Sequence, residues 1–211
     1  MAFGPMMTVT TKQGLELELA PFARDELRPF VEGFARGTVT QYFAEHRAQT
    51  LETEQAWYDK TIADKESIVW GIWAKDGETR RLIGGTSLVS ITRKHVHTAI
   101  SGIIIVDKNY WGKGVASASH HARTWYAFEN LGLHCIKSAV VQGNVASRAP
   151  SSGVAILIST PSATTALSMA SCTIPTTLSV STPSTGPGTS GGGATNPRPS
   201  TQQLASTASP H

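Results

Sequence analysis

A glycine-containing turn holds the residues whose types and spacing best fit ligand chemistry, in the pattern Asn109-x-x-Gly112-x-Gly114. Glycine carries no side chain, so such a turn can gather backbone N–H groups around an anion without obstruction. A helix predicted to begin near Val115 adds the positive end of its dipole. The pattern therefore predicts a phosphate-binding turn. Glycine is also the default residue of tight turns, so a purely structural turn is the alternative.

Few titratable side chains near the motif segments are suited to moving protons. His95, His97 and Glu129 are the candidates for a general base, although each is more typical of a surface group. The pairs His95-x-His97 and His120-His121 have the residue type of metal ligands. No carboxylate or cysteine set accompanies them at ligand spacing, so the sequence predicts no metal site.

Hydrophobic periodicity predicts the elements that must position this turn. Leu15–Leu19 alternates with period two, which is typical of a half-buried strand. Residues from about 23 to 34 carry apolar side chains at helical spacing, and a second helix is predicted from 52 to about 63. The caps and apolar contacts of the second helix are expected from Thr50, Thr53, Trp57 and Ile62.

Three antiparallel strands, a helix and a last strand are predicted to follow. The three strands are expected at 67–74, 82–91 and 98–106, with a hairpin turn at 75–78. The near-continuous apolar run Ile103–Val106 predicts burial on both faces of its strand. The helix is expected from about 115 to 130, with Gly132 as a left-handed cap, and the last strand at 135–141.

Three segments together resemble the GCN5-related N-acetyltransferase (GNAT) superfamily. They are 102–116, which contains Trp-Gly-Lys-Gly, then Ala127-Phe-Glu-Asn-Leu-Gly-Leu-His134, then Gly143-Asn-Val-Ala-Ser-Arg148. Their order and spacing are similar to those of the RimJ/RimL-like branch, which acetylates the N-termini of ribosomal proteins. Asn109 departs from the Gln or Arg that begins the family's loop. The resemblance covers residues 13–148, which we predict to form a GNAT domain.

The resemblance implies an α/β fold with a mixed, mostly antiparallel sheet and flanking helices. Acetyl-CoA would lie between two splayed parallel strands. Its pantetheine amides would pair with the backbone of Ile104, Ile105 and Val106. Its pyrophosphate would lie over Trp111, Gly112, Lys113, Gly114, Val115 and Ala116. Lys113 would offer a charge to this group or point to solvent.

The resemblance also assigns roles to two residues after the last predicted strand. Asn144 would hydrogen-bond the pantetheine arm, and Ser147 would protonate the departing thiolate. Both residue types are also common helix caps, so a capping role is the alternative.

The reaction implied is direct attack of a neutral amine on the thioester carbonyl, without a covalent enzyme intermediate. The acceptor would be a small-molecule amine or a protein N-terminus, and the sequence does not choose between them. Monomer and homodimer are equally compatible with it. A catalytically impaired acetyl-CoA-binding remnant is the alternative function, and an interaction protein with a disordered tail is a third.

Composition divides the chain at Arg148. The residues before Ala149 carry 32 of the 33 charged side chains and every aromatic ring, whereas Ser, Thr, Pro, Gly and Ala dominate 149–211. Low charge and this bias predict a disordered, low-complexity tail. The domain is predicted to lack the family's closing helix and strands, and the apolar island 154–158 is a candidate to patch its exposed sheet edge.

The change in composition after Arg148 leads to the hypothesis that the tail is translated from a shifted reading frame. Codons regrouped across 150–156 permit Leu-Glu-Arg-Cys-Gly-Tyr, the family phrase that is missing here, and DNA sequencing of this stretch decides the matter.

Bulk properties narrow the partners and the compartment. A net charge of +3 without a basic stripe argues against nucleic acid. No secretion signal or run of about 18 apolar residues is present, so no membrane association is predicted. Cys135 and Cys172 lie in different compositional halves, which argues against a disulfide framework. The expected location is the cytoplasm.

Overall fold

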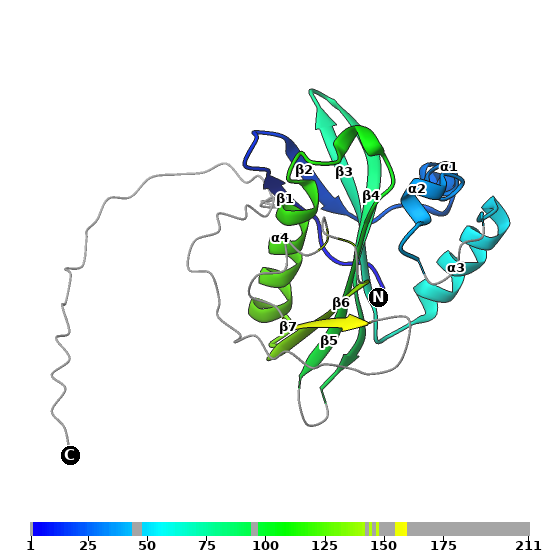
Figure 1. The fold of residues 1–211 in the computed structure, drawn as a ribbon. Helices are drawn as coiled ribbons and strands as arrows, with labels where there is room; N and C mark the ends of the chain where they lie inside the picture. Colours follow the sequence, from blue (N-terminus) through cyan, green and yellow to red (C-terminus); the bar gives the residue numbers. More distant parts are fainter. Residues whose placement is uncertain are drawn as a thin grey trace, which may run out of the picture.

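The fold is a single sheet with helices on both faces (Figure 1). The structure, a computed structural model, describes residues 2–43, 48–93, 97–141, 144 and 147, and a strand at 155–159. The strands are β1 Met7–Thr10, β2 Glu16–Ala20, β3 Ile68–Asp76, β4 Thr79–Thr92, β5 Thr98–Ile105, β6 Cys135–Val141 and β7 Ala155–Ser159. The helices are α1 Arg28–Phe34, α2 Gly37–Thr40, α3 Leu51–Ala63 and α4 Val115–Glu129, with short 3-10 helices at Arg24–Leu27 and Lys108–Tyr110.

Strand order in the sheet follows the chain from β1 to β7. The first five strands pair antiparallel in succession, whereas β6 lies parallel to both β5 and β7. A parallel connection needs a crossover, and α4 supplies it between β5 and β6. The prediction of a mixed, mostly antiparallel sheet with flanking helices is confirmed.

Strands β5 and β6 pair only over their first four residues. The register runs from Thr98 opposite Cys135 to Ser101 opposite Ser138, where the two hydroxyls hydrogen-bond. Beyond Ser101, β5 keeps β4 as its neighbour, and beyond Ser138, β6 keeps β7. The two strands therefore diverge toward their C-terminal ends and leave an opening in the sheet.

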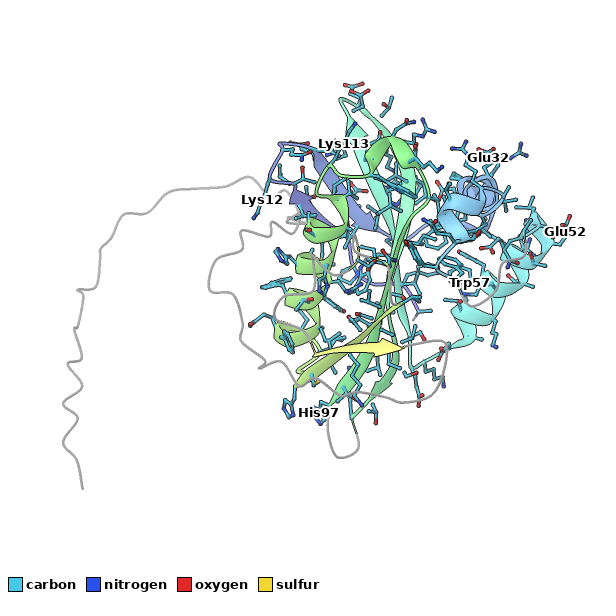
Figure 2. The ribbon with its side chains drawn as sticks, viewed as in Figure 1. Lys12, Glu32, Glu52, Trp57, His97 and Lys113 are labelled. Carbon is cyan, nitrogen blue, oxygen red and sulfur yellow. The ribbon has the colours of Figure 1, made fainter. Side chains whose placement is uncertain are left out.

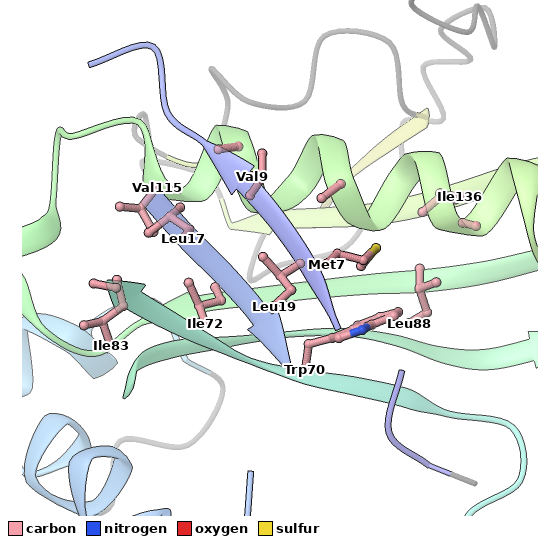
Figure 3. Packing of buried hydrophobic residues seen from close by; sticks show 14 of the residues in the cluster. Met7, Val9, Leu17, Leu19, Trp70, Ile72, Ile83, Leu88, Val115 and Ile136 are labelled. Atoms are coloured by element: carbon pink, nitrogen blue, oxygen red, sulfur yellow. The ribbon is translucent and has the colours of Figure 1, made fainter. Parts of the chain in front are cut away.

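Two hydrophobic cores lie on opposite faces of the sheet. One packs α4 against the first strands, and Figure 3 shows its side chains, among them Leu17, Leu19 and Trp70, converging beneath that helix. The other lies beneath α1 and α3 and contains Phe22, Leu27, Phe30, Tyr58, Val69, Trp73, Leu82 and Val106. The sheet therefore has an α4 side and an α1–α3 side (Figure 1).

The predicted cap of α3 is confirmed. Thr50 Oγ1 accepts a hydrogen bond from Thr53 N, and Thr53 Oγ1 accepts one from Thr50 N. We expect Thr50→Ala to lower the free energy of unfolding by about 1 kcal/mol, because it leaves a helix N–H unsatisfied. Denaturant unfolding measures this. Thr10→Ala, at an exposed position of β1, is the control and should change stability by less than about 0.5 kcal/mol.

Two predictions about apolar faces need correction. Ile62 is 49% exposed and the buried residues of α3 are Glu54, Tyr58 and Thr61. Trp57 is 42% exposed but makes the expected apolar contact by stacking on Phe22. Within Ile103–Val106, only Val106 is buried, and Ile103 is 37% exposed. The physical reason in the second case is that the apolar run borders cavities rather than packed helices.

Three elements escaped prediction, namely β1, α2 and the 3-10 helix Lys108–Tyr110. The first two are only four residues long, too short for a periodic pattern. Strand β7 occupies most of the apolar island expected to patch the sheet edge. The rest of the predicted tail lies outside the described residues. In the described part of the chain, no helix combines the length and apolarity that crossing a bilayer requires.

Candidate functional site

The turn between β5 and α4 has the backbone geometry of an anion site. Gly112 and Gly114 have φ angles of 73° and 75°, in the left-handed region that favours glycine. Asp107 holds the start of the turn, since its Oδ1 accepts from Asn109 N at 3.0 Å. Gln13 Nε2 donates to Gly112 O at 3.1 Å and ties the turn to the β1–β2 connection.

The amide groups of this turn are available to a ligand. Within the described part of the chain, the N–H groups of Gly112, Lys113 and Gly114 donate to no protein acceptor. The first N–H groups of α4, from Val115 onward, also lack intrahelical partners by the geometry of a helix start. These donors and the positive helix end together suit a phosphate group.

A cavity of about 650 Å³ fills the opening between β5 and β6. Eight of the ten predicted cofactor residues line it: Ile104, Ile105, Trp111, Gly112, Gly114, Val115, Ala116 and Asn144. Ser147, the predicted acid, lines it as well. The structure therefore brings the turn, the diverging strands and the segment after β6 to one place.

Val106 and Lys113 are not among the residues that line this cavity. Val106 is buried, and its N–H donates to Ile83 O at 2.9 Å, so this amide serves the sheet and the predicted pairing with pantetheine does not fit it. Lys113 is exposed, with its Nζ 5.4 Å from the centre of the Tyr110 ring. Figure 2 shows Lys113 at the turn end of the molecule, far from His97.

Strand alternation identifies which backbone groups face the opening. Because the backbone of Val106 bonds β4, that of Ile104 faces β4 as well, and the backbone groups of Ile103 and Ile105 face the side where β6 diverges. The predicted pairing of pantetheine with the Ile104 backbone therefore does not fit either. The carbonyl of Ile105 accepts from the indole Nε1 of Trp111 at 2.9 Å. Trp111 thus occupies the acceptor that an incoming amide N–H would use.

Asn144 and Ser147 combine the two roles that the sequence left open. Asn144 Oδ1 accepts from Ser147 N at 3.2 Å, which is a capping contact. In the described part of the chain, the Nδ2 group of Asn144 has no acceptor. One end of the amide therefore holds the local turn, and the other end, on a residue that lines the cavity, has no acceptor among the described residues.

A second cavity, of about 570 Å³, lies on the α1–α3 side. It shares Phe43, Gly102, Ile103 and Ile104 with the first, so the two cavities meet at the stretch of β5 that lacks a β6 partner. Glu54 lines this second cavity and is only 8% exposed. Burial raises the pKa of its carboxyl group. Sequence reasoning missed Glu54, although its spacing with Tyr58 and Thr61 places it on the inner face of α3.

A buried cation borders the first cavity. Arg123, which is 2% exposed, donates through Nη1 to Gly102 O at 2.7 Å and through Nη2 to His120 Nδ1 at 2.6 Å. Burial lowers the pKa of Arg123 to about 9, and burial together with the neighbouring Arg123 and His121 lowers that of His120 to about 3. At neutral pH, His120 is therefore a neutral acceptor for a charged arginine.

Two of the three predicted general bases, His97 and Glu129, lie away from both cavities. His97 Nδ1 lies 3.2 Å from Gly132 O, and its ring stacks on His134 at the opposite end of the sheet from the turn (Figure 2). Glu129 is exposed at the end of α4, and His95 lies outside the described residues. Among those described, no three His, Cys, Asp or Glu side chains gather as a metal site would require.

Comparison with known proteins relates this geometry to one family. The family model described as an acetyltransferase (GNAT) domain matches residues 16–150. A curated relative, the probable N-acetyltransferase YjcK of Bacillus subtilis, is 31% identical over 124 residues, which are 59% of this chain and 65% of that protein. The chain thus spans just under two thirds of that relative.

Two solved structures share the fold. Spermidine N-acetyltransferase from Vibrio cholerae, in complex with CoA and spermine, has a TM-score of 0.50 at 26% identity, over 57% of this chain and 68% of that one. RimJ from Mycobacterium smegmatis, in complex with CoA-disulfide, has a TM-score of 0.57 at 14% identity, over 69% and 72%. With a family model that covers most of the sequence up to Arg148, the chain belongs to the GNAT acetyltransferase family.

Proposed function

We propose that this chain transfers an acetyl group from acetyl-CoA to a primary amine. The observation that carries the proposal is that the two cavities meet at the part of β5 that has no β6 partner. A cofactor entering from the α4 side and an amine entering from the α1–α3 side would be held against each other there, which is the main requirement of a direct transfer.

The residues of the first cavity fit acetyl-CoA. The unpaired amides of the turn and the start of α4 would hold the pyrophosphate, and the backbone of Ile103 and Ile105 with Asn144 Nδ2 would hold the pantetheine amides. Acetyl-CoA supplies the activated thioester. Ser147 would donate a proton to the leaving sulfur. By analogy with the RimJ-like fold, the acceptor would be a protein N-terminus or a small amine.

Isothermal titration of the full chain with acetyl-CoA tests the cofactor site, and release of the CoA thiol in the presence of amines tests the transfer. Absence of binding would overturn the proposal. Binding without thiol release over a broad amine panel would instead favour the alternative, an acetyl-CoA-binding remnant.

Separate effects are expected from Ser147→Ala and Asn144→Ala. Loss of the Ser147 hydroxyl should lower kcat about tenfold or more and leave the Kd for acetyl-CoA within about twofold, because a proton donor acts on the leaving group. Loss of the Asn144 amide should raise Kd, since it removes both a donor and the cap of the local turn. Titration and steady-state rates of the two variants check this, and equal effects on kcat and Kd in both would contradict the division of roles.

Trp111 should report binding through its fluorescence. Its indole N–H must leave Ile105 O if a ligand amide takes that carbonyl, so acetyl-CoA should change the emission. Trp111→Phe should abolish the change, whereas Trp57→Phe on α3, outside the first cavity, should retain it. If Trp111→Phe still shows the emission change of the unaltered chain, another tryptophan gives the response and the prediction is wrong.

A further inference from the structure

We propose that the cavity on the α1–α3 side binds a primary amine with one positive charge and an apolar group, and that Glu54 receives the proton of its ammonium group. This inference rests on the proposed function and adds to it the acceptor's chemical class and the residue that activates it.

Five aromatic side chains contribute to the cavity wall. Trp57 stacks on Phe22 at 6.4 Å between ring centres, and Phe22, Phe30, Phe34 and Phe43 continue the chain at 5.6 to 6.1 Å. All five rings line the cavity. Trp57 and Phe43 are 42% and 39% exposed. An apolar ligand group would cover this exposed surface, and the ring faces would attract a neighbouring cation.

Glu54 is the single charged side chain among the described residues that line this cavity. No described side chain hydrogen-bonds its carboxylate or forms an ion pair with it. A carboxylate on a side chain that is only 8% exposed is costly to keep ionised without a partner. A bound ammonium group supplies that partner, and its affinity for the cavity rises accordingly.

Charge complementarity selects among amines. The cavity offers one negative charge and an aromatic surface, which match an amine with one ammonium group and an apolar substituent. A polyamine would bring two or three further charges into a cavity whose described lining offers them no counter-ion. The spermidine acetyltransferase that shares the fold is therefore not a guide to the acceptor of this chain.

The proton balance is complete. Glu54 takes one proton from the ammonium group and later passes it to solvent. The neutral nitrogen then forms the C–N bond as the C–S bond breaks, and a second proton leaves nitrogen for the departing sulfur. The net change is ammonium plus thioester to amide, free thiol and one proton. No oxidant or metal is required.

The test compares Glu54→Gln with Glu52→Gln, which removes an exposed carboxylate on the outer side of the same helix (Figure 2). With 2-phenylethylamine as acceptor, Glu54→Gln should lower kcat/KM about a hundredfold, and Glu52→Gln should leave it within about twofold. Spermidine should be a poorer acceptor than 2-phenylethylamine for the unaltered chain, by about tenfold or more.

Stability provides a readout that does not depend on turnover. Because burial raises the pKa of Glu54 in the folded chain, its ionisation opposes folding. The loss of stability is absent at a pH below the ordinary carboxyl pKa. It reaches its full size at a pH above the raised pKa of Glu54 in the folded chain. At pH 7.5, Glu54→Gln should therefore raise the thermal unfolding midpoint, and 2-phenylethylammonium should raise that of the unaltered chain but not of Glu54→Gln.

The outcomes separate the two proposals. If the unaltered chain fails to bind acetyl-CoA in titration, the proposed function falls. If it binds acetyl-CoA but Glu54→Gln keeps half of the activity, the role of Glu54 is overturned. A preference for spermidine overturns the acceptor class. If no amine is acetylated, the shift of the thermal unfolding midpoint with 2-phenylethylammonium is the deciding measurement. An equal shift, or no shift, in the unaltered chain and in Glu54→Gln overturns the amine site.

Discussion

Replacing Gly114 by Val is expected to weaken acetyl-CoA binding at least tenfold. Gly114 has a φ of 75°, and an L-residue held in the left-handed region costs about 1–2 kcal/mol. A β-branched residue relieves this strain by moving the turn, which displaces the amides that are to hold the pyrophosphate. About 1.4 kcal/mol of lost binding energy corresponds to a tenfold higher Kd. Isothermal titration measures it.

Gly132→Val provides the matched control. Gly132 also has a left-handed φ, 62°, and open space around it, but it follows the opposite end of α4. The strain and the loss of stability should be similar, whereas the Kd for acetyl-CoA should stay within about twofold. An equal loss of affinity in both variants would show that general destabilisation, rather than the geometry of the turn, explains the effect.

The turn was predictable from the sequence because its chemistry is local. An apolar strand, two glycines at fixed spacing and a helix start are contiguous, and positive φ angles at Gly112 and Gly114 confirm what the spacing indicated. Strands of five or more residues within 2–141 were also predicted, to within a few residues at each end. Each has a clear periodic pattern with turn residues at its ends.

The second cavity was not predictable in the same way. Its wall comes from α1, α2, α3, β3, β4 and β5, and no spacing in the sequence indicates that Phe30 and Glu54 face the same space. The periodicity of α3 was also misread. Ile62 is exposed, whereas Glu54 lies on the buried face beside Tyr58 and Thr61. A carboxylate on a buried face breaks the local rule, and such exceptions concentrate at functional sites.

Arg123 is another buried residue that the sequence did not reveal. The stabilities of its Lys and Met variants should fall in an unusual order. We expect Arg123→Lys to lower the free energy of unfolding by about 2–3 kcal/mol and Arg123→Met to lower it by only about 1 kcal/mol. Lysine keeps a buried charge but has one nitrogen, so it cannot reach both Gly102 O and His120 Nδ1 as the two ends of the guanidinium do.

Methionine removes the charge and leaves few groups without partners. Thr86 Oγ1 still donates to Gly102 O at 2.9 Å, and Thr124 Oγ1 lies 3.3 Å from His120 Nδ1. No carboxylate among the described residues pairs with Arg123, so replacing Arg123 by Met leaves no described carboxylate without its counter-ion. Denaturant unfolding of both variants measures the order. Arg24→Met, which breaks an exposed pair with Asp59, is the control and should cost less than about 1 kcal/mol. A more stable Arg123→Lys than Arg123→Met would show that the charge itself stabilises the fold, through a partner other than those that Gly102, Thr86 and His120 provide.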